Sequence, residues 1–414
     1  AAAHARAVAP HIHRFTPFAP ELMTLTMSGE KIDNGAGKRL IFQIGQDQLT
    51  PKACYYGLDL EAHNVKTYYF SQDKSGLSAA TMEKHQLKAE IVPKNLIWHW
   101  LRYLRLLLSL KPSHIEMYLS IRPWTLFFYT VCARLLGVPI VTWCRGEILF
   151  WEQHHPLRRL ANRYALRSSR LILLRELKMD EVLAKHRVVE ESRTRFVPNS
   201  VPVGPPVNSD RNRNVLFMNS FKPWRNVHLV VEAARHVVDV FPDAKFEIVG
   251  ATSTFETYSP AKNVDDVEYQ LVKLIEELNL NAHVEILPFT DDTEPYLRRA
   301  MLFLLPADIV FCNFSLLEAM AAGIVPIVAD VEGSDRIVED TVSGYIVQRD
   351  AKKMAEKVIH LFENDDLRHR MSHAAKARIK EHYSTESRAQ MLLELYQNEV
   401  WNRGPYQTSF MEPV

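Results

Sequence analysis

The sequence is poor in cysteine and carries almost no net charge. Its 414 residues include four cysteines, and 50 Lys and Arg against 49 Asp and Glu give a formal net charge of +1. No two cysteines have a CxxC spacing, which argues against a zinc site or a disulfide framework and favours a reducing compartment. The charge balance argues against a surface built to hold nucleic acid, so we expect no nucleic-acid partner.

Long apolar runs are also missing. The closest candidate for a membrane span, residues 126–144, contains Arg134, Gly137 and Pro139, so a buried helix that leads into a buried strand explains it better. Residues 1–20 lack the apolar core of a signal peptide. We therefore expect a cytoplasmic protein with a flexible lead over residues 1–37.

What the sequence does have is an alternation of short apolar runs with helical patterns. Hydrophobic residues make up 47% of the chain, enough for a real core, and 414 residues suit two domains. Strands alternating with helices predict the α/β class, with a parallel, doubly wound Rossmann-like sheet in each domain and a cleft between the two domains. The predicted strands are 40–44, 66–70, 115–119, 139–143 and 171–174, then 215–219, 245–249, 284–287, 302–305 and 326–329.

A proline-rich stretch divides the two series. Residues 201–214 hold three prolines and a glycine without apolar periodicity, which is typical of a linker. The predicted parts are a lead at 1–37, a first domain at 38–200, a linker and hinge at 201–214, a second domain at 215–385, and a C-terminal helix with a tail at 386–414.

The second half holds the residues that indicate chemistry. Lys222 and Arg225 follow the predicted strand 215–219, at the sheet edge where an anion would bind. Glu318 falls in the first turn of a short predicted helix that begins at 316. Two interpretations of Glu318 stay open: a carboxylate that favours the helix dipole, or one that accepts hydrogen bonds from ribose hydroxyls beside a diphosphate at the helix N-terminus.

Five blocks between residues 196 and 397 form a recognisable series: FVPNSV (196–201), VLFMNSFKPWRNV (215–227), PDAKFEIVG (242–250), LLEAMAAGIVPIVAD (316–330), and the trailing Gly333, 336–338 and Ser343-Gly344. In order and spacing they resemble the motifs of the retaining GT-B glycosyltransferases of the "group 1" family, family 4. In the first half, VTWCRGE (141–147) is similar to the loop that follows a strand of the family's first domain.

The resemblance implies a metal-independent, cofactor-free hexosyltransferase of glycan or polysaccharide biosynthesis. Its donor would be a nucleotide sugar, UDP- or GDP-linked, bound in the second domain, and its acceptor a glycan or lipid-linked glycan bound to the first domain. In the family an Arg and a Lys five residues apart neutralise the diphosphate, and the second glutamate of a Glu-x7-Glu element, here Glu318, contacts the ribose. The implied catalytic residues are Glu318, Arg225 and Lys222, and the implied donor-binding residues are Asn219, Ser220, Gly250, Phe289, Thr290, Asn313, Ser315, Leu316, Leu317 and Glu318.

The chain departs from the family pattern at several positions. Ser220 stands where the family has the Arg, Asn219 where it has a Gly, and Val310 where it has the first Glu. Lys222 could replace the missing cation, and Asp308 the missing carboxylate. Two hypotheses are therefore kept: an active retaining transferase, or a pseudoenzyme that binds nucleotide or serves as a scaffold. Other GT-B chemistry, such as epimerisation or phosphorolysis, stays as a remainder.

The acceptor side is predicted at loops after strands of the first domain. Arg122 and Arg145 are candidates for an anionic acceptor or ordinary surface cations, and Glu147 for orienting an acceptor hydroxyl or capping a helix. The acceptor-side residues are Gly45, Gln46, Arg122, Arg145, Gly146 and Glu147.

Two stretches of the first half mix cations with apolar residues. Residues 95–111 combine tryptophans with arginines, and residues 154–170 place Arg159, Arg163, Arg167 and Arg170 at helical spacing. They are either helices packed on the sheet with solvated cations, or a peripheral contact with an anionic membrane surface at the inner face of a membrane.

Overall fold

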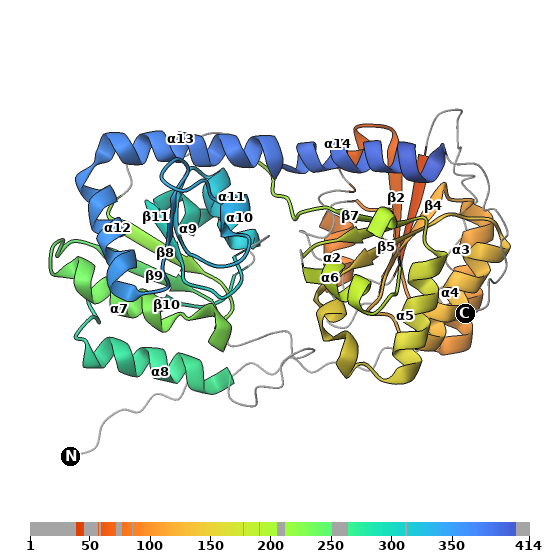
Figure 1. Ribbon diagram of the computed structural model, residues 1–414, viewed down its shortest axis with the longest axis horizontal. Helices are drawn as coiled ribbons and strands as arrows, with labels where there is room; N and C mark the ends of the chain where they lie inside the picture. The colour runs from red at the N-terminus through yellow and green to blue at the C-terminus, as the bar shows by residue number, and fades with distance from the viewer. Residues whose placement is uncertain are drawn as a thin grey trace, which may run out of the picture. The chain divides into compact units, whose positions relative to one another are not determined.

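Two parallel α/β domains make up the described part of the chain (Figure 1). The computed structural model describes residues 39–44, 57, 59–71, 77–84, 86–176, 178–189, 191–204, 212–250, 264–290, 292–310 and 313–402. Every strand pair in the two sheets is parallel. The predicted fold class, two Rossmann-like sheets, is confirmed.

The first sheet has seven strands among the described residues, in the order β3-β2-β1-β4-β5-β6-β7. They are β1 (Arg39–Ile44), β2 (Val65–Ser71), β3 (Ala89–Ile91), β4 (His114–Tyr118), β5 (Ile140–Cys144), β6 (Leu171–Leu174) and β7 (Thr194–Phe196). Its helices are α2 (Leu77–Lys84), α3 (Leu96–Leu110), α4 (Pro123–Leu135), α5 (Pro156–Ser168) and α6 (Lys178–Lys185), with a 3₁₀ helix at Gly146–Gln153. The direction of winding reverses between β1 and β4.

The second sheet has six strands among the described residues, in the order β10-β9-β8-β11-β12-β13. They are β8 (Asn214–Met218), β9 (Lys245–Val249), β10 (Val284–Leu287), β11 (Leu302–Leu305), β12 (Val325–Ala329) and β13 (Tyr345–Val347). The helices are α7 (His228–Val238), α8 (Val264–Glu277), α9 (Glu294–Arg299), α10 (Phe314–Ala321), α11 (Ser334–Ile337), α12 (Ala351–Glu363) and α13 (Asp365–His382). Here the winding reverses between β8 and β11.

The central strands are buried along their whole length, as their sequences require. IVTWC of β5 and LILL of β6 offer no polar alternation, and every residue of both strands is buried. Strands of parallel sheets are covered on both faces, so they read as continuous apolar runs. The apolar run at 126–144 is accordingly split between α4 and β5, which confirms the prediction of a buried helix leading into a buried strand. None of the helices in the described ranges is long and apolar enough to cross a bilayer.

The C-terminal segment belongs to the core of the first domain. After α13, the helix α14 (Thr385–Leu395) and a π-helical turn (Tyr396–Trp401) pack with Ile41, Val141 and Trp143 of the first sheet (Figure 1). The chain therefore leaves the first domain, builds the second, and returns.

A buried polar network fixes this return. The carboxyl group of Glu116 on β4 is fully buried. Its oxygens accept hydrogen bonds from the hydroxyl of Tyr396 (2.5 Å), the indole Nε1 of Trp143 (3.0 Å) and the amide of Gln43 (3.2 Å). Trp401 donates its indole N–H to Nδ1 of the neighbouring His114 at 3.0 Å. Buried polar groups are costly unless they are paired, so these bonds select one docked position for the segment.

Element boundaries differ from the sequence prediction by a few residues, and one difference matters. The helix predicted from 316 begins at Phe314, because Asn313 caps it by accepting the N–H of Leu316 at 3.2 Å. Glu318 is then the fifth residue of α10, so the prediction that it lies in the first turn is wrong. The dipole interpretation of Glu318 weakens accordingly, since that effect falls off within one turn.

Removing the carboxyl group of Glu116 should weaken the packing of residues 385–401 on the first sheet. Glu116→Ala leaves three buried donors without their acceptor, so we expect a loss of about 3 kcal/mol in the free energy of unfolding, against about 1 kcal/mol for Tyr396→Phe. Urea denaturation measures both. Equal losses in the two variants would contradict a network centred on Glu116.

His99 should make the stability of the first domain depend on pH. Burial, reinforced by Arg122, lowers the pKa of His99 from 6.5 to about 4. The unfolded chain thus binds a proton between these pH values that the folded chain does not, so stability falls as pH drops through this window. In His99→Gln the change of denaturation midpoint from pH 7 to pH 4 should be smaller than in the wild type. An unchanged difference would show that other groups cause the acid sensitivity.

Candidate functional site

The point where the second sheet reverses its winding collects the predicted donor residues. β8 and β11 are neighbours, and the described segments that follow them, residues 219–227 and 306–310, leave the same edge of the sheet. Asn219, Ser220, Lys222 and Arg225 lie on the first segment, and Asn313 is the N-cap of α10. In open α/β sheets ligands bind at such a reversal.

The two segments are joined by hydrogen bonds. The N–H of Asp308 donates to the carbonyl of Trp224 at 2.9 Å. The side-chain amide of Asn226 donates to the carbonyl of Pro306 at 3.1 Å and to Oδ1 of Asp308 at 2.8 Å. Asn226 has a positive φ of 50°, a conformation that asparagine tolerates. We call these contacts, with the bond from Arg225 described next, the β8–β11 clamp.

Arg225 is half-buried within this clamp. Its Nη1 donates to the carbonyl of Ile309 at 3.2 Å. Burial lowers the pKa of its guanidinium, while Asp308 acts in the opposite direction. Its Nε is buried and has no hydrogen-bond partner among the described residues. A buried guanidinium N–H without a partner is costly, and an anionic ligand would satisfy it.

Lys222 faces a cavity of about 520 Å³. Its ammonium group lies 5.3 Å from the ring centroid of Trp224. The cavity is also lined by His228, Lys273 and Glu277. The ammonium group of Lys273 lies 3.4 Å from a carboxylate oxygen of Glu277, so this wall carries charges of both signs.

At the N-terminus of α10, backbone N–H groups are more accessible to a ligand than side chains are. Leu316 and Leu317 are fully buried in the core of the second domain. Of these two predicted donor residues, only the backbone can therefore meet a ligand. Ser315 is partly exposed near the helix start, and the partly buried Glu318 lies one turn further on.

Residues after β9 and β10 complete this edge. Gly250 follows β9, and a Cβ there would come within 2.1 Å of the carbonyl oxygen of Asn219. The side-chain oxygen of Asn219 accepts the N–H of Ser220 at 2.9 Å. Phe289 is exposed after β10, and the hydroxyl of Thr290 accepts the N–H of Asp292 at 3.0 Å. Gly250 thus permits a close backbone approach.

Two departures from the family pattern now have a structural description. Val310 is fully buried within the core of the second domain, so it cannot bind a sugar. Asp308 accepts from Asn226 and forms an ion pair with Arg349. Its carboxylate is part of the clamp, which argues against the idea that it takes over sugar binding.

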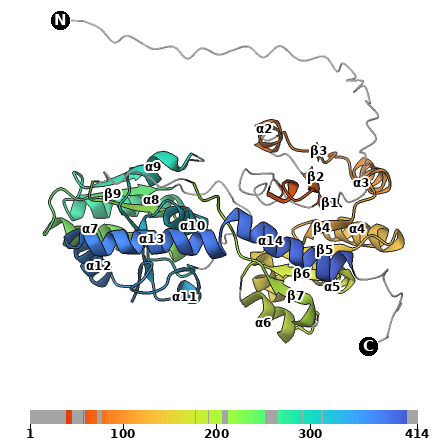
Figure 2. The same cartoon turned by 90° about the horizontal axis from the view of Figure 1, so that it is seen from above.

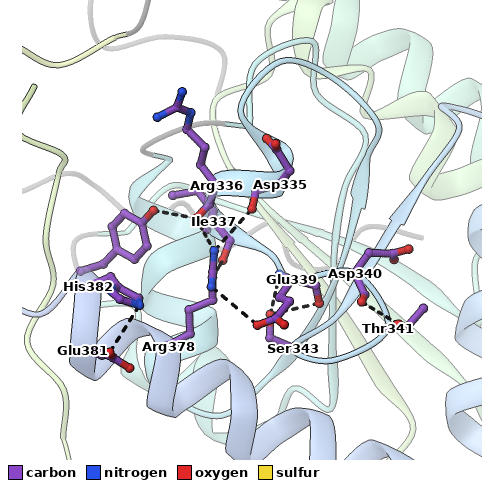
Figure 3. Close-up of polar contacts among 11 residues, drawn as sticks. Asp335, Arg336, Ile337, Glu339, Asp340, Thr341, Ser343, Arg378, Glu381 and His382 are labelled. Carbon is purple, nitrogen blue, oxygen red and sulfur yellow. Dashed lines mark hydrogen bonds and ion pairs between the residues drawn. The ribbon is translucent and has the colours of Figure 1, made fainter.

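Figure 3 shows how the trailing block is held. Arg378 of α13 donates from Nε to the carbonyl of Ile337 at 2.8 Å and from Nη2 to the carbonyl of Arg336 at 2.8 Å. The hydroxyl of Tyr383 also donates to the carbonyl of Arg336, at 2.7 Å. These donors satisfy the carbonyls at the end of the short helix α11, and the side chain of Arg336 points away from them (Figure 3).

Only some of the residues predicted on the acceptor side fall within the described part of the chain. Gly45, Gln46 and the side chain of Glu147 lie outside them. Arg122 precedes α4 and is exposed, and Gly146 begins the 3₁₀ helix after β5. The Arg145 guanidinium carbon lies 4.2 Å from the ring centroid of Tyr118, and its Nε is buried without a partner in the described ranges.

Sequence reasoning missed Arg175 at the same edge. Arg145 and Arg175 directly follow Cys144 and Leu174, which are register partners on β5 and β6. The guanidinium carbon of Arg175 lies 5.1 Å from the ring centroid of Trp143, and the rings of Trp143 and Tyr118 stack with centroids 6.4 Å apart. An arginine directly after a buried parallel strand was the available signal. Two neighbouring guanidiniums held on stacked rings suit an anionic group.

Comparison with known proteins agrees with this geometry. Residues 205–378 match the family described as Glycosyl transferases group 1. One curated relative is the poly(ribitol-phosphate) alpha-N-acetylglucosaminyltransferase of Staphylococcus aureus, 27% identical over 42% of this chain and 33% of that protein. Another is the UDP-Gal:alpha-D-GlcNAc-diphosphoundecaprenol alpha-1,3-galactosyltransferase of Escherichia coli, 23% identical over 66% of this chain and 73% of that protein.

A solved structure extends the likeness to both domains. Anabaena HepE in complex with UDP aligns with a TM-score of 0.70 at 15% identity, over 87% of this chain and 99% of that chain. The likeness covers the first domain, where the family match does not reach, and it shows the fold, which is GT-B.

Substitution of Gly250 tests whether the close approach between Gly250 and the backbone of Asn219 is rigid. Gly250→Ala would place a methyl group against the carbonyl of Asn219, so we expect a loss of about 1–3 kcal/mol in the free energy of unfolding. Gly204→Ala is the matched control, because a Cβ there meets nothing within 4 Å. Thermal denaturation measures both, and a neutral Gly250→Ala would show that the edge can move apart.

Proposed function

We propose that this chain, whose second domain is a group 1 glycosyltransferase domain, transfers a hexose from a nucleoside diphosphate sugar to a glycan or lipid-linked glycan. The reaction would retain the anomeric configuration and need no metal ion. The observation that carries the proposal is the β8–β11 clamp, which holds Arg225 half-buried, with a buried Nε that has no hydrogen-bond partner among the described residues.

The donor would bind along this edge through its diphosphate. Arg225 supplies a fixed positive charge, and the first N–H groups of α10 supply the positive end of a helix dipole. Lys222, with its flexible stem, would replace the cation that Ser220 lacks. Glu318 would accept hydrogen bonds from the ribose. Side-chain cations and helix amides then do the work that a metal ion does elsewhere.

Transfer would proceed on one face of the sugar. The acceptor hydroxyl oxygen forms a bond to the anomeric carbon while the bond from that carbon to the β-phosphate oxygen breaks. The acceptor proton passes to the departing phosphate, so that a nucleoside diphosphate leaves and charge is conserved. Arg225 and Lys222 stabilise the negative charge that develops on the leaving group, and catalysis depends on such preorganised charges.

The acceptor would bind at the edge of the first sheet. Arg145 and Arg175, with Arg122 at the start of α4, form a cationic edge suited to a phosphate-bearing acceptor. The Escherichia coli relative is named for an acceptor linked to diphosphoundecaprenol, which has this chemistry. We place the reaction in the cytoplasm, at the inner face of a membrane.

A catalytically inactive nucleotide-binding protein of the same fold remains the second candidate. The observation that favours it is the buried Val310 together with the committed carboxylate of Asp308. Both positions would otherwise recognise the donor sugar. An inactive protein would still bind the nucleoside diphosphate, so binding and transfer must be measured separately.

Calorimetric titration with UDP and GDP, without added metal, tests the donor site. We expect one of them to bind, and Arg225→Ala to weaken it about tenfold to a hundredfold, the value of a hydrogen bond to a charged group. Because Arg225 also bonds Ile309, the thermal stability of the variant is recorded alongside. Binding that appears only with a divalent cation would refute the metal-free proposal.

Glu318→Gln tests the ribose contact and separates the two candidates. We expect transfer from UDP- or GDP-sugars to fall at least about tenfold with the fold intact, since a charged hydrogen bond is lost. Glu276→Gln, an exposed carboxylate of α8, is the matched control. Nucleotide binding without transfer or sugar release in the wild type would favour the inactive protein.

A further inference from the structure

Large apolar side chains project from the outward faces of two neighbouring helices of the first domain. Figures 1 and 2 place α3 and α4 next to one another, and they are in contact. Trp98 is 66% exposed and Trp124 62% exposed. We define the α3–α4 face as Ile97, Trp98, Leu101 and Leu108 of α3 with Trp124 and Phe127 of α4, all of which are exposed.

This exposure remains after the helices have completed their packing. The opposite side of α3 buries Tyr103, Leu106, Leu107 and Leu110. Trp100 stacks on Phe128 with ring centroids 4.8 Å apart, which ties α3 to α4. Within the part of the chain that the structure describes, no element of the domain covers these outer side chains. Several large apolar side chains exposed on two adjacent helices indicate an interaction site.

Cations predominate around the face, although Glu90 of β3 is ion-paired with Arg102 of α3 at 2.5 Å. The sequences of α3, α4 and α5 contain no Asp or Glu. Exposed cations stand around the apolar residues: Lys94 before α3, Arg105 within it, Lys111 at its end and Arg122 before α4. By contrast, α8 of the second domain reads VDDVEYQLVKLIEE, with several carboxylates. In a chain of net charge +1, this face is a local basic region with a tryptophan-rich centre.

Chemistry distinguishes the possible occupants. A second copy docked through the same face would bring cation against cation, because a two-fold interface repeats each residue. No helix of the described chain can span a bilayer, so the face would lie on the membrane and not cross it. Tryptophans at the interface, aliphatic side chains below it and cations on phosphates are the pattern of a surface-bound helix.

We propose that the α3–α4 face docks on a bilayer that contains anionic phospholipids. Trp98, Trp124 and the neighbouring aliphatic side chains enter the headgroup region, and the surrounding cations pair with lipid phosphates. The inference goes beyond sugar transfer and does not depend on it. If both hold, docking presents the cationic edge of the first sheet to acceptors held in the same membrane.

The arginine row of α5 does not contribute to this face. Arg163 and Arg167 of α5 donate to the carbonyls of His186 and Val188, and Arg170, which follows α5, donates to the carbonyl of Val400. For the stretch 154–170 the structure therefore favours the interpretation of a helix packed within the domain. The docking surface is confined to the stretch that includes α3 and to α4.

Flotation with lipid vesicles tests the proposal. We expect the full chain to bind vesicles of equal parts phosphatidylcholine and phosphatidylglycerol, and to bind pure phosphatidylcholine more weakly. Trp98→Ser with Leu101→Ser should weaken binding at least about tenfold, because two large apolar side chains no longer enter the bilayer. Tyr269→Ser with Val272→Ser is the matched control, since these residues are exposed one turn apart on α8 and should have no effect.

The cations are tested separately. Lys94→Gln with Lys111→Gln should weaken binding to the anionic vesicles about tenfold and leave binding to phosphatidylcholine unchanged, since each cation near an anionic surface contributes independently. Absence of binding to either vesicle would overturn the proposal, as would equal losses in the Tyr269 control. Self-association in lipid-free buffer that Trp98→Ser with Leu101→Ser abolishes would identify a second copy as the occupant.

The calorimetric nucleotide titration keeps the two proposals apart. The vesicle variants should bind nucleotide as the wild type does, because they lie in the first domain away from Arg225. Loss of vesicle binding with intact nucleotide binding supports docking by this face. Vesicle binding without any nucleotide binding would leave docking intact and reject the proposed donor site.

Discussion

The hydrogen bonds between the segments after β8 and β11 are the constraint on which the candidate donor site depends. Neighbouring parallel strands bring two segments to one edge but leave their conformations free. Asn226, Asp308 and Arg225 remove that freedom, because each bonds a backbone or side-chain group of the opposite segment. The clamp holds the guanidinium of Arg225 half-buried, although desolvation of that charge opposes the position. The site is thus stabilised by the same residues that give it charge.

The architecture could be predicted from the sequence, whereas the state of individual side chains could not. Apolar runs such as LILL predict the strands, because a strand that is buried on both faces of a sheet is apolar along its whole length. The sequence predicts the start of α10 at residue 316, two residues too late. Whether Asn313 caps the helix depends on the conformation of its side chain, which the sequence alone does not show. Whether Asp308 was available to a sugar depended on Arg349, which lies 41 residues away in the sequence. Such pairings are set by the fold and have no local signal.

The two domains distribute charge in opposite ways although they share one topology. In the second domain, Lys222 and Arg225 lie at one sheet edge, and helices such as α8, α12 and α13 carry charges of both signs. In the first domain, cations occur at the edge and also across α3, α4 and α5, which lack carboxylates altogether. A net charge near zero therefore hides a strong asymmetry. The asymmetry follows the expected division of labour between a small anionic donor and an acceptor at an anionic surface.

The return of α14 to the first sheet has a consequence for the order of events during synthesis. A ribosome releases the residues of the first sheet early, yet Glu116 must wait for Tyr396 before its carboxyl group is fully satisfied. Until then the nascent sheet presents Ile41, Val141 and Trp143 without the segment that covers them. The second domain, contiguous in the chain, can close on itself in the meantime. The domain that is translated first is therefore the one completed last.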